Sequence, residues 1–125
     1  MEEIDKKARN FFILGKVAEK LGMISESASN YFKALSGVND FMLKKINLTA
    51  KNHGDRFSLL KQHYPKLYEI TDKLFTAYRR TYSEELEKEE LIRLRKNIEE
   101  AFKHAVISTP TDKEIEERTK EISKR

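Results

Sequence analysis

Polar side chains gather at a segment that we predict to be the one non-helical break in a chain of helices. The segment 52–60 places an imidazole at His53 beside a flexible glycine and an Asp55/Arg56 pair. A second cluster follows further along the chain and brings cationic and aromatic groups together at Tyr78, Arg79, Arg80 and Tyr82. Arginine binds phosphate through paired hydrogen bonds, and a tyrosine ring stacks on a base. If two antiparallel helices turn these clusters toward each other, they form a groove for a phosphate-bearing aromatic ligand.

Each of these residues also has a structural interpretation. His53 and Asp55 stand where a short helix is expected to begin, so either side chain could cap backbone N–H groups instead of contacting a ligand. Adjacent helical residues point about 100° apart, so only one of Arg79 and Arg80 can face the groove. The structural alternative for each arginine is an ion pair with the acidic run that starts at Glu84.

The sequence lacks the patterns of a metal site or a phosphate loop. No two of the three histidines stand four residues apart, there is no cysteine, and the four glycines are widely separated. These facts exclude a helical two-histidine metal face, thiolate chemistry and a glycine-rich phosphate loop. We therefore predict no metal, no cofactor and no catalytic residue.

Apolar residues spaced by three and four predict helices along almost the whole chain. Gly22 is suited to a left-handed helix end, and Ser25 is suited to cap the next helix. Gly37 favours close packing against a neighbouring helix, and Pro65 fits a first helical turn. The apolar stripes run over 4–21, 28–46, 57–64, 67–78 and 91–105, and a tail helix over 112–125 carries Ile115 and Ile122.

These elements predict an all-α fold, an up-and-down four-helix bundle with an extra short helix and a C-terminal tail helix. No segment alternates apolar and polar residues as a strand would. We assign 1–107 to the bundle and 108–125 to the tail of the same domain. Thr111 and Glu114 match a capping box at the start of the tail helix, which we expect to be mostly solvated.

The composition fits one cytoplasmic domain. A chain of 125 residues is long enough to bury a core of its own. No signal peptide or long apolar run is seen, so we predict no membrane contact and a cytoplasmic location. Charged residues make up 37% but the net charge is only +4, which is weak evidence for nucleic acid. Abundant Lys and Glu with two prolines are also typical of a thermophile.

The chain contains a series of short motifs in this order: Ala8, Gly15, Leu21-Gly22, Ala28, Tyr31-Phe32-Lys33-Ala34-Leu35, Asn52-His53-Gly54-Asp55-Arg56, Leu59-Leu60, Leu74, Tyr78-Arg79-Arg80 and Tyr82. These motifs resemble those of HEPN domains, prokaryotic helical bundles also called nucleotidyltransferase substrate-binding-like domains. The resemblance covers about residues 4–105. It implies a homodimeric bundle that works beside a small nucleotidyltransferase subunit, with a nucleotide or RNA as ligand.

The same resemblance implies roles for particular residues. His53 matches the family's histidine-bearing turn, and Arg79 or Arg80 with Tyr82 matches its later arginine–tyrosine step. The resemblance therefore implies that the ligand lies between these two motifs.

Some HEPN members are RNases or toxins of toxin–antitoxin pairs, with an arginine shortly before a histidine. On the corresponding late helix, Arg95 and His104 are too far apart for that motif. Arg56 and His63 have a permitted spacing, but they lie in another part of the bundle and on one helix face.

Three functions follow from the sequence. The leading hypothesis is a non-catalytic module that binds a nucleotide or substrate, or docks a partner, and whose ligand-binding residues are His53, Asp55, Tyr78, Arg79, Arg80 and Tyr82. The first alternative is a metal-independent RNase that uses Arg56 and His63. The second is a helical protein-interaction scaffold, although the required repeat does not recur along the chain.

Overall fold

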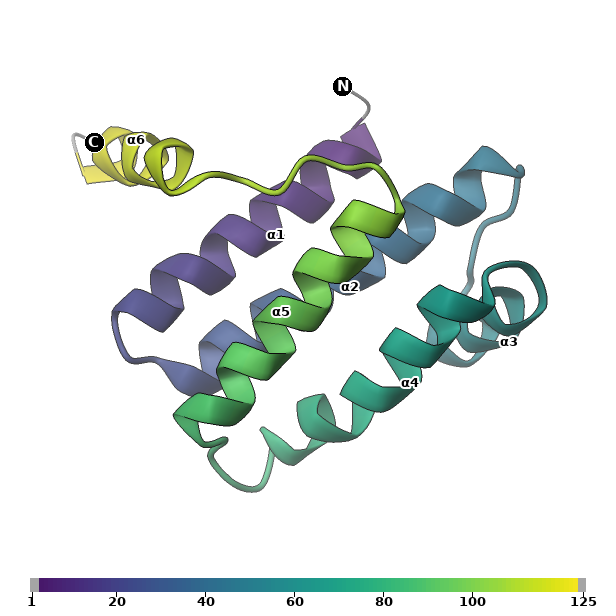
Figure 1. Ribbon diagram of the computed structural model, residues 1–125, viewed down its shortest axis with the longest axis horizontal. Helices are drawn as coiled ribbons and strands as arrows, with labels where there is room; N and C mark the ends of the chain where they lie inside the picture. Colours follow the sequence, from purple (N-terminus) through teal and green to yellow (C-terminus); the bar gives the residue numbers. More distant parts are fainter. Residues whose placement is uncertain (1–2, 124–125) are drawn as a thin grey trace.

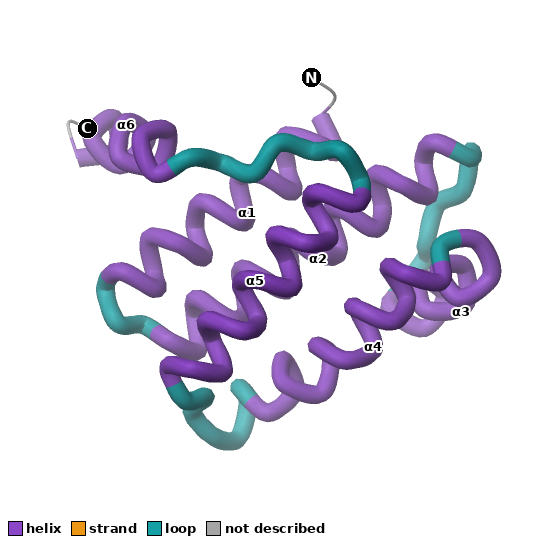
Figure 2. The backbone as a smooth tube through the Cα atoms, in the orientation of Figure 1, coloured by secondary structure: helices purple, strands orange, loops and turns teal. Residues whose placement is uncertain are grey.

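A computed structural model describes residues 3–123 and shows six α-helices and no strand in that part of the chain (Figures 1 and 2). The predicted all-α bundle with an extra short helix and a tail helix is confirmed. The helices are α1 (Glu3–Lys20), α2 (Ile24–Lys45), α3 (His53–His63), α4 (Pro65–Arg80), α5 (Lys88–His104) and α6 (Asp112–Ser123). None of these helices is both long enough and apolar enough to cross a membrane.

The helix α2 forms the centre of the bundle. It packs against α1, α3, α4 and α5, while α6 packs against α1 (Figure 1). The four long helices run alternately up and down, and α3 connects α2 to α4 at one end. The buried core therefore lies between the long helices, and it contains Phe12, Tyr31, Leu35, Leu43, Leu60, Leu67, Leu91, Leu94, Ile98 and Phe102.

Two glycines allow α1 and α2 to approach closely. A Cβ atom at Gly15 would lie 2.5 Å from the Tyr31 ring, and one at Gly37 would lie 3.0 Å from the backbone of Ala8. The Ser27 hydroxyl donates a 2.7 Å hydrogen bond to the Gly15 carbonyl, which joins the same two helices. The predicted role of Gly37 in close packing is confirmed, and Gly15 has the same role.

The helix ends follow the predicted turn chemistry at two places and differ at a third. Gly22 has a φ of 76°, which glycine adopts without strain, and Pro65 is the first residue of α4. The prediction that Ser25 caps α2 is wrong. Because the Ser27 N–H bonds to the Met23 carbonyl at 2.9 Å, α2 is already helical before Ser25.

The tail helix α6 is mostly solvated, as predicted, but it is anchored on α1 by one buried side chain. Ile115 is only 1% exposed, and an ion pair joins Glu114 to Arg9 at 2.7 Å. The Glu114 N–H donates to the Thr111 hydroxyl, so half of the predicted capping box forms, whereas the Glu114 carboxylate turns to Arg9. That ion pair lowers the pKa of Glu114. The predicted contributions of the Ile4 and Ile122 side chains, and the end of the tail at 124–125, lie outside the described residues.

Candidate functional site

One face of α4 and the turn that follows it carries three aromatic rings and an arginine. Phe75, Tyr78, Arg79 and Tyr82 stand at positions i, i+3, i+4 and i+7, so helical geometry places them side by side. We call these four residues the α4 patch. Three of its members, Tyr78, Arg79 and Tyr82, belong to the second cluster of the sequence analysis, whereas Arg80 lies outside the patch.

The α4 patch rests on an aromatic platform from other helices. The Phe32 ring of α2 stacks on Tyr78 with centroids 4.3 Å apart and an angle of 10° between the rings. Phe75 makes a tilted contact with Phe32 at 5.7 Å and an edge contact with Phe57 of α3 at 5.3 Å. Such ring pairs hold one another in a fixed geometry, so the exposed end of the patch is preorganised.

The platform also brings His53 to the patch, as the sequence predicts. The His53 ring centroid lies 6.3 Å from that of Phe32 and 6.1 Å from that of Phe75. The Nδ1 atom of His53 is 2.9 Å from Nη1 of Arg56. Because a guanidinium only donates, Nδ1 accepts this bond and the ring proton of neutral His53 lies on Nε2.

The helix α3 begins at His53, so the predicted non-helical break ends before this histidine and does not include it. The remaining polar groups at the α3 start organise the backbone. The Asn52 side chain accepts the Asp55 N–H at 2.8 Å, and the Asp55 carboxylate accepts the Lys51 N–H at 2.9 Å. Arg56 binds both carboxylate oxygens of Asp40 on α2, at 2.8 and 3.1 Å. The residue that caps α3 is therefore Asn52, while Asp55 binds the backbone N–H that precedes the cap. His53 is the member of this turn that reaches the patch.

The two adjacent arginines have different environments. The Arg79 guanidinium lies over the Phe75 ring, 5.9 Å from its centroid, and pairs with no carboxylate among the described residues. Arg80 instead binds Glu84 and, at 2.7 Å, Glu90 at the start of α5. These two carboxylates raise the pKa of Arg80 and neutralise its charge. The ion-pair interpretation thus holds for Arg80, while Arg79 faces the aromatic rings.

Tyr78 and Tyr82 are linked through their hydroxyl groups, which are 2.7 Å apart. This hydrogen bond, together with burial, raises the pKa of Tyr78 to about 12. Tyr78 is partly buried and stacks on Phe32, whereas the Tyr82 side chain is 77% exposed and open to solvent.

Two shallow hollows flank the turn after α4. One, of about 270 Å³, is lined by Thr76, Arg79, Arg80 and Ser83. The other, of about 300 Å³, is lined by Ser25, Glu26, Ser29, Asn30, Thr81 and Tyr82. The first hollow combines a guanidinium without a carboxylate partner with two hydroxyl groups, and the second is bordered by the exposed tyrosine.

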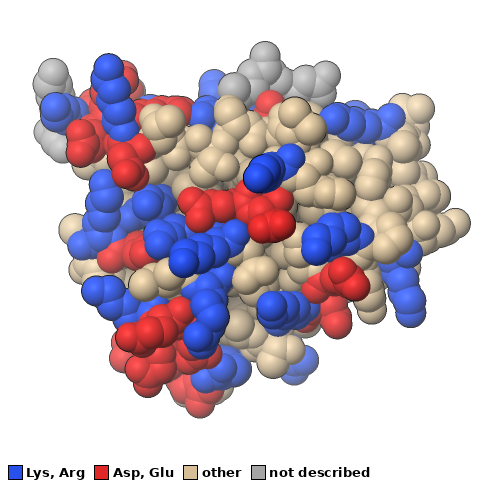
Figure 3. All heavy atoms as spheres, viewed as in Figure 1, with Lys and Arg blue, Asp and Glu red and all other residues tan. Residues whose placement is uncertain are grey.

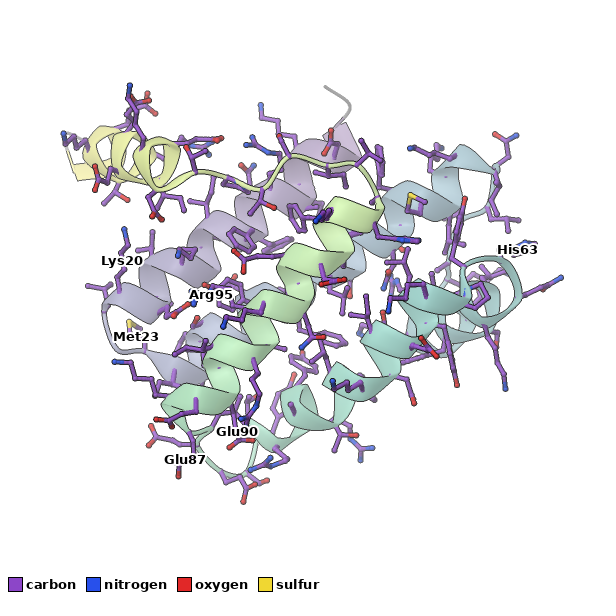
Figure 4. All side chains as sticks on the ribbon, viewed as in Figure 1. Lys20, Met23, His63, Glu87, Glu90 and Arg95 are labelled. Carbon is purple, nitrogen blue, oxygen red and sulfur yellow. The ribbon has the colours of Figure 1, made fainter. Side chains whose placement is uncertain are left out.

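The other predicted pair, Arg56 and His63, does not converge on a common point. Arg56 faces α2, where Asp40 neutralises it. His63 is exposed at the last position of α3 and projects away from the bundle (Figure 4). Seven residues of α-helix separate them by about 10 Å along the axis.

Sequence reasoning did not assign some residues that shape the site. Phe32 and Phe75 were recognised as apolar helix positions but not as the support of Tyr78 and Arg79. Asp40 is a charged residue beside the apolar stripe of α2, a signal that could have identified the partner of Arg56.

Charge is not concentrated on the face drawn in Figure 3, where cationic and anionic side chains are interspersed. Among the described residues, no three His, Asp or Glu side chains are grouped so that they could hold a metal ion. No protein-family model matches the chain, and the searches found no matching curated protein or solved structure. Its function is therefore inferred from the geometry above.

Proposed function

We propose that this protein is a non-catalytic binding module whose α4 patch takes a nucleotide, a ligand that joins a phosphate group to an aromatic base. One observation carries the proposal: Arg79, which has no carboxylate partner among the described residues, lies one turn from the exposed ring of Tyr82. Most of the other arginines described here bind a carboxylate, so an unpaired guanidinium beside an exposed ring is the best-suited place for an anionic aromatic ligand.

Each group has a separate task in this proposal. Arg79 binds the phosphate through charge-assisted hydrogen bonds, with the hydroxyl groups of Thr76 and Ser83 in the same hollow. Tyr82 stacks on the base, and its hydrogen bond to Tyr78 holds the ring in place. His53 supports the platform from the side of α3 and offers its Nε2–H as a donor.

The environments of Arg56 and His63, the one arginine–histidine pair with an RNase-like spacing in the sequence, favour binding over catalysis. Arg56 has two bonds to Asp40 and a third to His53, so its charge is already compensated. General acid–base catalysis needs the histidine within hydrogen-bond reach of the reacting group that the arginine would hold. His63 lies two helical turns from Arg56, which gives less support to the RNase alternative.

The HEPN resemblance adds a cytoplasmic homodimer and a nucleotidyltransferase subunit to this proposal. Exposed apolar residues near the α1–α2 turn, Leu21 (69%) and Met23 (45%), offer a surface that a second copy would cover. Light scattering coupled to size-exclusion chromatography tests this point. We expect Leu21→Glu to convert the dimer to a monomer and Val106→Glu, at another exposed apolar residue, to leave it unchanged. A wild-type monomer contradicts the homodimer.

The binding proposal is tested by titrating isotope-labelled protein with ATP and AMP and following the backbone amide resonances. We expect shifts centred on residues 76–83. A charge-assisted hydrogen bond contributes about 1.5–3 kcal/mol, so Arg79→Ala should raise Kd about 10- to 100-fold. Arg80→Ala is the matched control, since Arg80 is neutralised by carboxylates, and it should change Kd less than threefold. Equal losses in both variants, or no shifts at millimolar nucleotide, would overturn the proposal.

A further inference from the structure

We propose a second anion site, for a phosphate group, in a hollow at the open end of the α1–α2 hairpin. The hollow has a volume of about 280 Å³ and is lined by Lys7, Asp40, Lys44, Leu48, Thr49 and Ala50. It shares no lining residue with the two hollows beside the α4 patch. This inference is therefore independent of the nucleotide proposal.

The local sequence builds the hollow by ending α2 sharply. Asn47 has a φ of 61°, a conformation that asparagine tolerates better than most residues. The Leu48 N–H then bonds back to the Leu43 carbonyl at 3.0 Å, which turns the chain. As a result, Thr49 and Ala50 lie beside Lys44 and opposite Lys7 of α1.

The charges lining the hollow do not cancel. Both carboxylate oxygens of Asp40 are used by Arg56, so that pair is neutral. Lys7 and Lys44 are exposed and form no ion pair with any described residue. Two uncompensated ammonium groups that face one hollow favour an anion, and a phosphate group is negatively charged at neutral pH both as the free ion and within a strand.

Unused hydrogen-bonding groups accompany the two lysines. The Thr49 hydroxyl and the N–H groups of Thr49 and Ala50 make no hydrogen bond within the part of the chain that the structure describes. Thr49 is exposed in the wall of the hollow. A phosphate group accepts hydrogen bonds from such donors, which gives the site a chemistry beyond charge alone.

The cationic surface continues from the hollow along the seam between the two helices. Lys33, Asp40 and Lys44 fall within about 40° of one another around α2. The Lys33 ammonium lies over the ring of Phe11, 5.8 Å from its centroid, and Phe11 is one helical turn from Lys7. This seam is about 16 Å long from Lys33 to Lys44, so the phosphate could be a free anion or one phosphate of a short single strand.

The experiment uses two ligands and a charge-matched pair of double variants. The binding of inorganic phosphate is followed by shifts of the backbone amide resonances. The binding of a fluorescent single-stranded octanucleotide is followed by fluorescence polarisation over a series of salt concentrations. The test variant is Lys7→Gln with Lys44→Gln. The control is Lys6→Gln with Lys45→Gln, which removes the same charge from exposed neighbouring positions that do not line the hollow.

We expect the test variant to weaken phosphate binding at least tenfold and the control to weaken it less than twofold. If the phosphate belongs to a strand, the test variant also lowers the slope of log Kd against log salt by about 1.4. In that case Lys33→Gln weakens the binding of the oligonucleotide but not that of inorganic phosphate. If the ligand is free phosphate, Lys33→Gln changes the Kd of neither ligand. Equal weakening by both double variants, or no amide shift around Thr49 with either ligand, would overturn this site. Neither result depends on Arg79.

Discussion

Replacing Gly15 by alanine tests whether the α1–α2 contact fixes the bundle. The new Cβ would lie 2.5 and 2.6 Å from two atoms of the Tyr31 ring, closer than real Cβ contacts allow. Tyr31 cannot easily move, because it is fully buried, packs on Phe12 at 5.3 Å and donates a 2.6 Å hydrogen bond to Glu19. The same burial and hydrogen bond raise the pKa of Tyr31.

Two effects of opposite sign decide the magnitude. Alanine gains about 1 kcal/mol of helix propensity over glycine. Overpacking a well-packed core costs about 1–3 kcal/mol, and weakening a hydrogen bond to a charged group costs about 1.5–3 kcal/mol. The net loss is about 3 kcal/mol. With an unfolding entropy of about 2.1 cal/mol/K per residue, a chain of 125 residues loses about 11 °C of Tm.

Thermal unfolding followed by circular dichroism measures this change, and Gly54→Ala is the control. A Cβ at Gly54 meets only the Asn52 side chain, at 3.4 Å, which is an ordinary contact. This variant keeps the gain in helix propensity and should raise Tm by about 2–4 °C. If Gly15→Ala raises Tm as much as Gly54→Ala does, the close contact with Tyr31 does not exist.

Three further predictions concern other parts of the fold. Val106 has a φ of 58° and is 88% exposed, so Val106→Gly should relieve backbone strain and stabilise the protein by about 1 kcal/mol in chemical denaturation; a destabilised variant would contradict this conformation. Ile115→Ala removes the buried anchor of α6, and hydrogen exchange should speed up over 112–121 but not in α2; protection that stays unchanged would show that Ile115 does not hold the tail helix. The pKa of Tyr78 is raised to about 12 in the fold, so its stabilising effect is complete below about pH 10 and is lost as the pH rises toward 12. Ultraviolet absorbance of tyrosinate should show this late titration, and in Tyr82→Phe the midpoint should shift back toward 10. An unshifted midpoint would contradict the hydrogen bond between the two tyrosine hydroxyl groups.

The helices were predictable because their determinants are local. Apolar spacing, the glycine after α1 and Pro65 at the start of α4 act within a few residues, so the sequence contains the information directly. The errors lie at two helix ends. Ser25 has the chemistry of a cap, yet α2 already begins at Ile24. Glu114 leaves its capping role for Arg9, which lies 105 positions away in sequence, so a distant partner overrides the local signal there.

The candidate site, like the fold, could be predicted from the sequence only in part. The sequence brought His53 and the residues 78–82 to attention through their chemical types. It could not separate Arg79 from Arg80, because that choice depends on Glu90 of α5 and on the Phe75 ring. Tertiary partners decide which charge remains available, and these are not visible in a local pattern.

The most direct test of the binding proposal is the ratio of nucleotide Kd values for Arg79→Ala and Arg80→Ala, measured for ATP in one buffer at one salt concentration. Adjacent arginines have the same type and the same formal charge, so a nonspecific electrostatic effect would weaken binding equally in both. We expect Arg79→Ala to bind ATP at least tenfold more weakly than Arg80→Ala. A ratio near one, or a larger loss in Arg80→Ala, would contradict the assignment of the α4 patch as the nucleotide site.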